Sequence, residues 1–486
     1  MTRGLDMADS AQSPKAGALP DQDDGVVWRW SLLVFISGFL IVALQIVWYR
    51  VIGVLLQSNG YSFSLVLSVL LLGDAAGLLV GARTIDRIAD PRRFFFLMQG
   101  VATTMAPCGA WFVYLAIGAG LLPSDFVDEN TMCCGYRNAA LVAFLVAGLL
   151  LLDLTGTTGT LKLLVAIGLA FAVLQLLGAR STRWAWLPAA VLAAGLALFP
   201  GGEAFWRRLH GLAVEKAIVA EDKTGLSLLK LENTQDGKLY IQGHSQSHLP
   251  FHTVHAFLGA IGPLTHPAPR RILVIGSGTG GTPYAAGLNP GTEQVQVIEI
   301  VVPVIATWRD YVAQGGRSGV DILLASPKFE IVVADGRHAL ALDPTRYDVI
   351  EADAILPKTA LSGLLNSQEF YRQAKAKLAP GGLYVQWAST ERSIETFRSV
   401  FPYVTMVHPA MIGSDRPIPY TRDKILELLA RPEIDLHLAA ARIDRGDLRK
   451  WFEDRNVEVL NDGKVVPAAS PNTDFFPRDE YYLNRP

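Results

Sequence analysis

The chain has 486 residues, of which half are hydrophobic, and its mean hydropathy is +0.28. An ordinary soluble protein of this length is less apolar, so part of the chain is expected to face lipid. The formal net charge of -2 excludes a globally basic surface, so no nucleic-acid partner is expected. The three cysteines, Cys108, Cys133 and Cys134, have neither a disulfide pattern nor zinc-type spacing.

Residues 1–27 are polar, lack the features of a secretory signal, and are expected to form a disordered tail. From Val27 to Pro200, long apolar stretches alternate with short polar breaks, and a helix that spans a bilayer needs about 20 such residues. The pattern predicts a multi-pass α-helical membrane domain over residues 28–200. Its six expected spans are 30–55, 62–82, 94–122, 138–153, 159–178 and 182–199.

The polar loops between these stretches differ in charge. Residues 83–93 carry four arginines, whereas Asp125, Asp128 and Glu129 lie in the next loop. Because cytoplasmic loops are enriched in Lys and Arg, both termini are expected in the cytoplasm, with the chain in the cell (inner) membrane. Arg180 and Arg183 would then lie on the outer side, against the rule.

Beyond residues 200–212 the composition becomes that of a soluble domain. The runs 225–231 and 238–243 predict a small β-hairpin subdomain over residues 212–265. Over residues 266–486, strand-like runs are each followed by a helical or loop stretch, which predicts a doubly wound, Rossmann-like α/β sheet of the methyltransferase type. These runs are 271–276, 294–300, 329–335, 347–353 and 382–388.

The sequence GSGTGG at residues 276–281 follows a strand-like run and precedes an Ala-rich helical segment, the context of a nucleoside-binding loop. Glu299 ends the next strand, where a carboxylate can bind both ribose hydroxyls. Asp335 and Asp353 end the two strands that follow. Because ligands bind outside the carboxyl ends of strands in an open sheet, these groups are expected to border one crevice. A tight turn beside a surface glutamate is the alternative interpretation.

Several stretches together resemble the polyamine aminopropyltransferases, of which spermidine synthase is the best known. They are YIQGHSQSHLPFHTVH, HPAPRRILVIGSGTGG, VIEI, VVADGRHAL, YDVIEADAILP and NSQEFYRQAKAKLAPGGLYVQW. The likeness covers residues 218–390, and FISGFLIVALQIVWYRVIG with the ending NTDFFPRDEYYLNRP resembles the membrane-fused branch of that family.

The resemblance implies roles for individual positions. Asp353 would receive the proton of an attacking amine, Glu299 would hold the ribose, and Asp335 the adenine amino group. The other implied donor-binding residues are Gln246, Gly276, Gly278, Gly280 and Gly336, and the candidates for the acceptor site are His255, Tyr347 and Gln386.

The implied reaction transfers an aminopropyl group from decarboxylated S-adenosylmethionine to a putrescine-like amine and releases methylthioadenosine, with no tightly bound cofactor. A homodimer is compatible with this resemblance. His244, His248 and His252 are closely spaced, but they lack acidic or cysteine partners at ligand spacing, so no metal site is predicted.

The sequence also departs from the family pattern. Thr279, Val301 and Leu356 stand where soluble relatives carry carboxylates. A lost charge-assisted hydrogen bond costs about 1.5 to 3 kcal/mol, which weakens the expected hold on cationic amines.

Two other functions remain open. One is an S-adenosylmethionine-dependent methyltransferase, because the same loop and ribose carboxylate bind either donor. The other is a non-catalytic membrane-bound nucleoside sensor or transport component, which Asp74 and Lys162 in the apolar helices permit.

Overall fold

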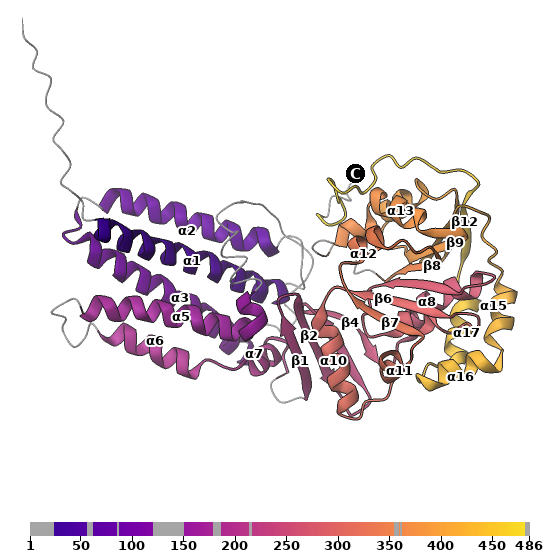
Figure 1. Cartoon of the computed structure of the whole chain (residues 1–486), viewed down its shortest axis with the longest axis horizontal. Helices are drawn as coiled ribbons and strands as arrows, with labels where there is room; N and C mark the ends of the chain where they lie inside the picture. Colours follow the sequence, from indigo (N-terminus) through magenta and orange to yellow (C-terminus); the bar gives the residue numbers. More distant parts are fainter. Residues whose placement is uncertain are drawn as a thin grey trace, which may run out of the picture.

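The computed structural model describes residues 24–55, 62–84, 87–119, 150–177, 186–212, 216–353, 359 and 362–481. Along these residues, a group of helices precedes a four-stranded sheet, and an α/β unit built on an eight-stranded sheet follows. Figure 1 places the four-stranded sheet between the helices and the α/β unit. Most of the expected N-terminal tail and of the predicted fourth span lies outside the described residues.

The N-terminal helices lie side by side as a bundle (Figure 1). They are α1 (Asp24–Leu55), α2 (Ser62–Thr84), α3 (Pro91–Gly118), α5 (Leu152–Leu177), α6 (Leu187–Leu198) and α7 (Gly202–Leu209). Leu40 and Ala43 of α1 and Leu164 of α5 are fully buried in their shared core. Helices α1, α3, α5, α6 and α7 therefore each have an apolar side that packs in this core.

By length and composition, two segments of the described chain qualify to cross a bilayer, Ser31–Leu55 and Leu152–Phe171. In the predicted sixth span, 182–199, the described residues 186–199 hold the 12-residue helix α6. A helix of that length is about 18 Å long, well short of the roughly 30 Å hydrocarbon core. Its Ala189–Leu198 part bends by 82° into α7, and the pair would count as a third span only if taken together.

The bundle is joined to the four-stranded sheet through a break in α5. Gly156 has φ +64° and interrupts that helix. The carboxylate of Glu221, from β1 (Ala217–Asp222), accepts hydrogen bonds there from the backbone N of Thr157 at 3.2 Å, from its hydroxyl at 2.9 Å, and from Nε1 of Trp206 at 2.8 Å. A strand of the sheet thus supplies the acceptor for a helix that restarts after the break.

The small sheet has the order β1-β2-β3-β4 and is antiparallel throughout. Its strands β2 (Gly225–Leu231) and β3 (Gly237–Ile241) form the predicted hairpin, and β1 and β4 (His244–Leu249) extend it on both sides. Leu228 packs in the bundle core, whereas Leu229 packs in the core of the α/β unit. β2 is therefore buried on both faces, and only its last two residues, Lys230 and Leu231, are partly exposed.

The eight-stranded sheet has the order β12-β10-β11-β9-β8-β5-β6-β7. Strands β5 to β9 pair with one another in parallel. Strands β10, β11 and β12 pair antiparallel. The bounds are β5 Arg271–Ile275, β6 Gln294–Glu299, β7 Phe329–Val333, β8 Tyr347–Ala352, β9 Leu378–Trp387, β10 Tyr403–Val407, β11 Ala410–Ser414 and β12 Val457–Asp462. The five predicted strands are present, although β9 begins earlier than the expected 382.

Helices cover both faces of this sheet. They are α8 Thr253–Thr265, α9 Gly281–Ala286, α10 Val302–Ala313, α11 Val320–Ala325, α12 Gly336–Leu342, α13 Gln368–Ala376, α14 Glu391–Arg398, α15 Arg422–Leu429, α16 Pro432–Ala440 and α17 Arg445–Asp454, with a 3-10 turn at Ser362–Asn366. This is the predicted Rossmann-like architecture. From β5 the chain continues to β6 and β7 on one side, and it then returns to place β8 on the other side of β5. In a doubly wound sheet, ligands bind at this point, outside the carboxyl ends of β5 and β8.

Candidate functional site

The glycine loop between β5 and α9 has a backbone that suits glycine at three positions. Gly276, Gly278 and Gly280 have φ values of +93°, +50° and +104°, which side chains with a Cβ rarely adopt. A Cβ on Gly276 would lie 2.7 Å from the main-chain oxygen of Asp353, whereas Gly278 faces open space. The loop therefore passes close to the end of β8 and leaves its tip accessible.

Glu299, the last residue of β6, is 5% exposed and holds this loop. Its Oε2 accepts hydrogen bonds from the backbone N and the hydroxyl of Ser277 at 2.9 and 2.5 Å, and its Oε1 accepts one from the backbone N of Val301 at 2.8 Å. The carboxylate thus lies directly beside the glycine loop at the carboxyl edge of the sheet.

Asp335 and Gly336 lie after β7, at the same edge. Asp335 is exposed, and its Oδ1 caps α12 by accepting from the backbone N of His338 at 2.7 Å. Gly336 packs tightly, because a Cβ there would lie 2.4 Å from a methyl group of Ile275. One oxygen of Asp335 is therefore used by the helix, and the exposed side chain lies at the carboxyl edge of the sheet.

Asp353, just after β8, is contacted by three side chains from separate elements. Its Oδ2 lies 3.0 Å from Nδ1 of His255 and accepts from the Thr282 hydroxyl at 2.7 Å, while its Oδ1 accepts from Nε1 of Trp387 at 2.8 Å. The Asp353 side chain is 11% exposed and that of His255 20%. The family resemblance indicated His255 but not Thr282 or Trp387, which reach Asp353 from α9 and from the end of β9.

Burial by itself raises the pKa of Asp353, but the charge of His255 and the hydrogen bonds from His255, Thr282 and Trp387 outweigh it and leave that pKa below its ordinary value. For His255, burial lowers the pKa, whereas Asp353 and the main chain of Gln246 raise it, with a net increase. The two residues therefore favour the ion pair over the neutral pair.

The other acceptor-site candidates are placed differently. Tyr347 begins β8, and its hydroxyl hydrogen-bonds Gln296 at 2.6 Å and Asp343, so it lies at the opposite edge of the sheet from Asp353. Gln386 is 2% exposed and bonds Tyr384 and Asn366 at 2.6 and 2.7 Å. Because successive residues of a strand point to opposite faces, its neighbour Trp387 points to Asp353 instead.

Gln246 lies in β4, half-buried, and its main chain contacts the imidazole of His255. Of the positions that depart from the family pattern, Thr279 and Val301 are buried beside the glycine loop, at 3% and 7% exposure. Leu356 lies outside the described residues.

A second carboxylate, Glu351, is fully buried one pleat before Asp353. Burial, and then the nearby charge of Asp353, raise its pKa well above the ordinary value. The charged form of Glu351 is therefore disfavoured next to Asp353. Over the described ranges, no three His, Cys, Asp or Glu side chains come together in a way that would hold a metal ion.

Comparison with known proteins identifies the family of this chain. The spermine/spermidine synthase domain matches residues 251–406. A polyamine aminopropyltransferase of Thermococcus onnurineus is 30% identical over 205 residues, 39% of this chain and 67% of that protein. The chain belongs to the spermidine synthase family. The matched domain includes the glycine loop, Glu299, Asp335, Asp353 and Trp387.

Other members of the spermidine synthase family match over different lengths. A polyamine aminopropyltransferase of Desulforudis audaxviator is 37% identical over 127 residues, 26% of this chain, and the matching segment spans 43% of that relative. A crystal structure of a spermidine synthase in complex with the transition-state analogue AdoDATO aligns with a TM-score of 0.39 and 19% identity, covering 49% of this chain and 88% of that one.

Proposed function

We propose that the chain is an aminopropyltransferase that moves an aminopropyl group from decarboxylated S-adenosylmethionine to an amine acceptor and releases methylthioadenosine. The observation that carries this proposal is Asp353, whose carboxylate is held by His255, Thr282 and Trp387 beside the glycine loop. Such a site offers negative charge to a cationic amine at the point where a nucleoside is expected to bind.

In this proposal the adenosine part of the donor lies across the carboxyl edge of the sheet. Gly278 leaves room for it, Glu299 holds the ribose hydroxyls, and Asp335 bonds the adenine amino group with the carboxylate oxygen that does not cap α12. Gln246, next to His255, lies at the sulfur end. Tyr347 is not part of the proposed acceptor site, because it begins β8 and lies at the opposite edge of the sheet.

The reaction is a displacement at carbon. The neutral amine nitrogen attacks the methylene carbon next to the sulfonium, the C–N bond forms as the C–S bond breaks, and the bonding electrons neutralise the sulfur of methylthioadenosine. Because the sulfonium is already activated, the protein has to align the two reactants and accept a proton from an amine whose ordinary pKa is about 10.

The Asp353–His255 pair is the proposed proton acceptor. Asp353 alone is a weak base, because three donors hold its pKa below the ordinary value. When His255 is neutral, the pair carries one negative charge and can take the proton, which ends on the imidazole as the favoured ion pair. When His255 is already protonated, the pair is neutral overall and the amine keeps its proton.

Methyl transfer from S-adenosylmethionine is the second candidate. It is favoured by one observation: the buried Thr279 stands in the glycine loop where the family carries an acid. Without that acid, the loop discriminates less in favour of the decarboxylated donor. The product separates the two reactions, since an acceptor gains an aminopropyl group in one and a methyl group in the other.

We further propose that the N-terminal helices form a multi-pass domain in the cell membrane, with the α/β unit in the cytoplasm. The apolar segments Ser31–Leu55 and Leu152–Phe171 support this, as do outward-facing apolar side chains such as Leu72 and Leu154, each 71% exposed. The arginines at positions 83–93 support a cytoplasmic loop. A reporter fused after Pro486 that is active only outside the cytoplasm would contradict this orientation.

The deciding experiment uses the detergent-purified chain. Binding of methylthioadenosine, S-adenosylmethionine and decarboxylated S-adenosylmethionine is measured by calorimetry, and products with a panel of amines are identified by mass spectrometry. Aminopropylated amine together with methylthioadenosine is the expected result. Methylated product would favour the second candidate, and nucleoside binding without turnover of any amine would favour a sensor.

A further inference from the structure

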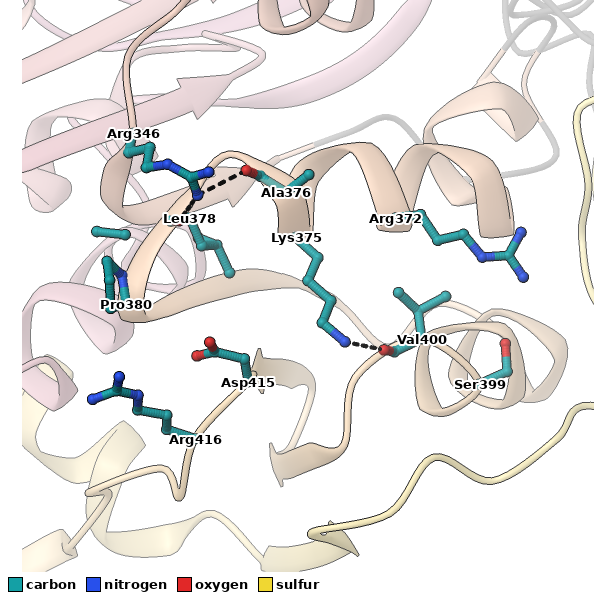
Figure 2. A pocket seen from close by; sticks show the side chains of 11 residues that line it. Arg346, Arg372, Lys375, Ala376, Leu378, Pro380, Ser399, Val400, Asp415 and Arg416 are labelled. Atoms are coloured by element: carbon teal, nitrogen blue, oxygen red, sulfur yellow. Dashed lines mark hydrogen bonds between the residues drawn. The ribbon is translucent and has the colours of Figure 1, made fainter.

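The cavity shown in Figure 2 lies at the opposite edge of the large sheet from Asp353. Its volume is about 620 Å³, within the range of small-molecule sites. Arg346 directly precedes β8, and Leu378 is the first residue of β9, so both lie at the amino ends of these parallel strands. With a rise of about 3.3 Å per residue, roughly 20 Å separates this cavity from Asp353. It is a separate place from the proposed active site.

Cationic side chains dominate the lining. Arg346, Arg372, Lys375 and Arg416 surround the cavity, against the single carboxylate of Asp415. They come from three different parts of the chain, as Figure 2 shows: the loop before β8, helix α13, and the residues after β11. The formal net charge of the whole chain is -2, so this concentration of positive charge is local.

Two of these cations are fixed by the backbone. Arg346 donates from Nη1 to the main-chain oxygens of Ala376 and Leu378 at 3.0 and 2.9 Å, and Lys375 donates from Nζ to that of Val400 at 2.9 Å (Figure 2). A side chain that is already held loses less conformational freedom when a ligand binds. These two positive charges are therefore pre-positioned at the wall of the cavity.

A purely structural explanation accounts for part of this set. Cations near the end of a helix offset the negative end of its dipole, and Arg346 at Ala376 does this for α13. This role does not extend to Arg416, which follows β11 and is not at the end of α13. Its guanidinium is exposed and has no hydrogen bond or ion pair within the described part of the chain. Asp415 forms no ion pair with Arg416 in that part of the chain: its Oδ1 accepts from the backbone N of Gly381 at 3.2 Å, and its charge acts on Lys375.

Apart from Ser399, the remainder of the lining is apolar, with Leu378, Pro380 and Val400 among its residues. A cavity with apolar walls and guanidinium groups fits a ligand that has an apolar ring and phosphate groups, because guanidinium matches the geometry of phosphate oxygens. We propose that this cavity binds a phosphorylated small molecule of nucleotide size, at a second site distinct from the nucleoside crevice.

The test measures calorimetric binding of ATP, inorganic pyrophosphate and adenosine to the detergent-purified whole chain. Saturating methylthioadenosine is present throughout, so that the proposed active-site crevice is occupied. We expect ATP to bind, pyrophosphate to bind more weakly, and adenosine not to bind. Affinity for ATP should fall as salt is raised, because the contacts are charged. This test is independent of the aminopropyltransferase proposal, because binding of methylthioadenosine is measured separately from binding of ATP.

The variant Arg416→Gln should weaken ATP binding by about tenfold or more, since it removes a charge-assisted contact and has no structural partner to lose. Arg309→Gln, an exposed arginine on α10, is the matched control and should leave ATP affinity unchanged. Several outcomes would overturn the proposal: no ATP binding by the wild type, equal affinity in Arg416→Gln, or an equal loss in both variants. Binding of phosphatidylglycerol vesicles without binding of ATP would also overturn it and assign the cations to a lipid surface.

Discussion

Nδ1 of His255 lies 3.0 Å from Oδ2 of Asp353, and the contact joins helix α8 to the end of β8. Because each residue stabilises the charged form of the other, the pKa of His255 is raised and that of Asp353 lowered, in both cases against the effect of burial. The pair, and not either residue alone, therefore determines how the site handles a proton.

Asp353→Asn tests this pair most directly. It removes the negative charge and leaves the shape, so turnover should fall about a hundredfold or more while methylthioadenosine binding stays nearly intact. Rates of wild type and variant should converge as pH rises from 7 to 10, because more of the amine is then free. Asp310→Asn, on the exposed surface of α10, is the control. A constant ratio of rates at every pH would instead assign Asp353 to positioning.

The pH profile of the wild type should show an ascending limb governed by His255. Protonated His255 leaves the pair without net charge, so activity should rise as pH passes the raised pKa of His255, above the ordinary 6.5. His255→Gln cannot titrate, so this limb should disappear from kcat while a lower rate remains. An unchanged limb in His255→Gln would place the titrating group elsewhere.

Trp387→Phe removes one donor to Asp353 and keeps an aromatic ring. The pKa of Asp353 should rise, because the hydrogen bond from Trp387 favours its charged form. Ionised Asp353 stabilises the fold above the pKa that it has in the unfolded chain, and this stability is lost as pH falls through its lower pKa in the folded chain. A higher pKa in the folded variant should move this loss to higher pH. Thermal unfolding across acidic pH measures this. Trp308→Phe is the control, since Nε1 of the buried Trp308 has no hydrogen-bond partner among the described residues.

Glu299→Gln should weaken methylthioadenosine binding by about tenfold or more, because charge-assisted hydrogen bonds to the ribose become neutral ones. The amide also replaces one of the oxygens that hold Ser277 and Val301, so circular dichroism should accompany the calorimetry. Glu293→Gln, on an exposed site before β6, should bind as the wild type does. Unchanged affinity in a folded Glu299→Gln would remove this residue from the ribose site.

Glu221→Ala should loosen the junction between the bundle and the small sheet. It leaves the donors of Thr157 and Trp206 without their acceptor, so the free energy of unfolding should fall by about 1 to 3 kcal/mol. Thermal unfolding in detergent measures the loss. Asp153→Asn breaks the ion pair to Lys223 across the same junction, but both side chains are partly exposed, so its effect should stay below about 1 kcal/mol. Equal effects of the two variants would contradict a special role for Glu221.

The parallel strands, and the edge of the sheet that carries the site, could be predicted from the sequence. Strands such as β5 and β8 are buried on both faces, so they are apolar runs that are visible in the sequence. The residues that follow β5, β6, β7 and β8 meet at one edge because parallel strands share a direction. Local order along the chain therefore predicted that the glycine loop, Glu299, Asp335 and Asp353 lie together.

The tertiary structure alone decided what surrounds Asp353. His255, Thr282 and Trp387 are 98, 71 and 34 residues away in the sequence, and no spacing rule connects them to it. The place of Tyr347 differs in this respect, because the predicted strand 347–353 already puts it at the opposite end from Asp353. Side-chain partners depend on how separate elements pack, and a pattern read along one segment contains no information about the segment that packs against it.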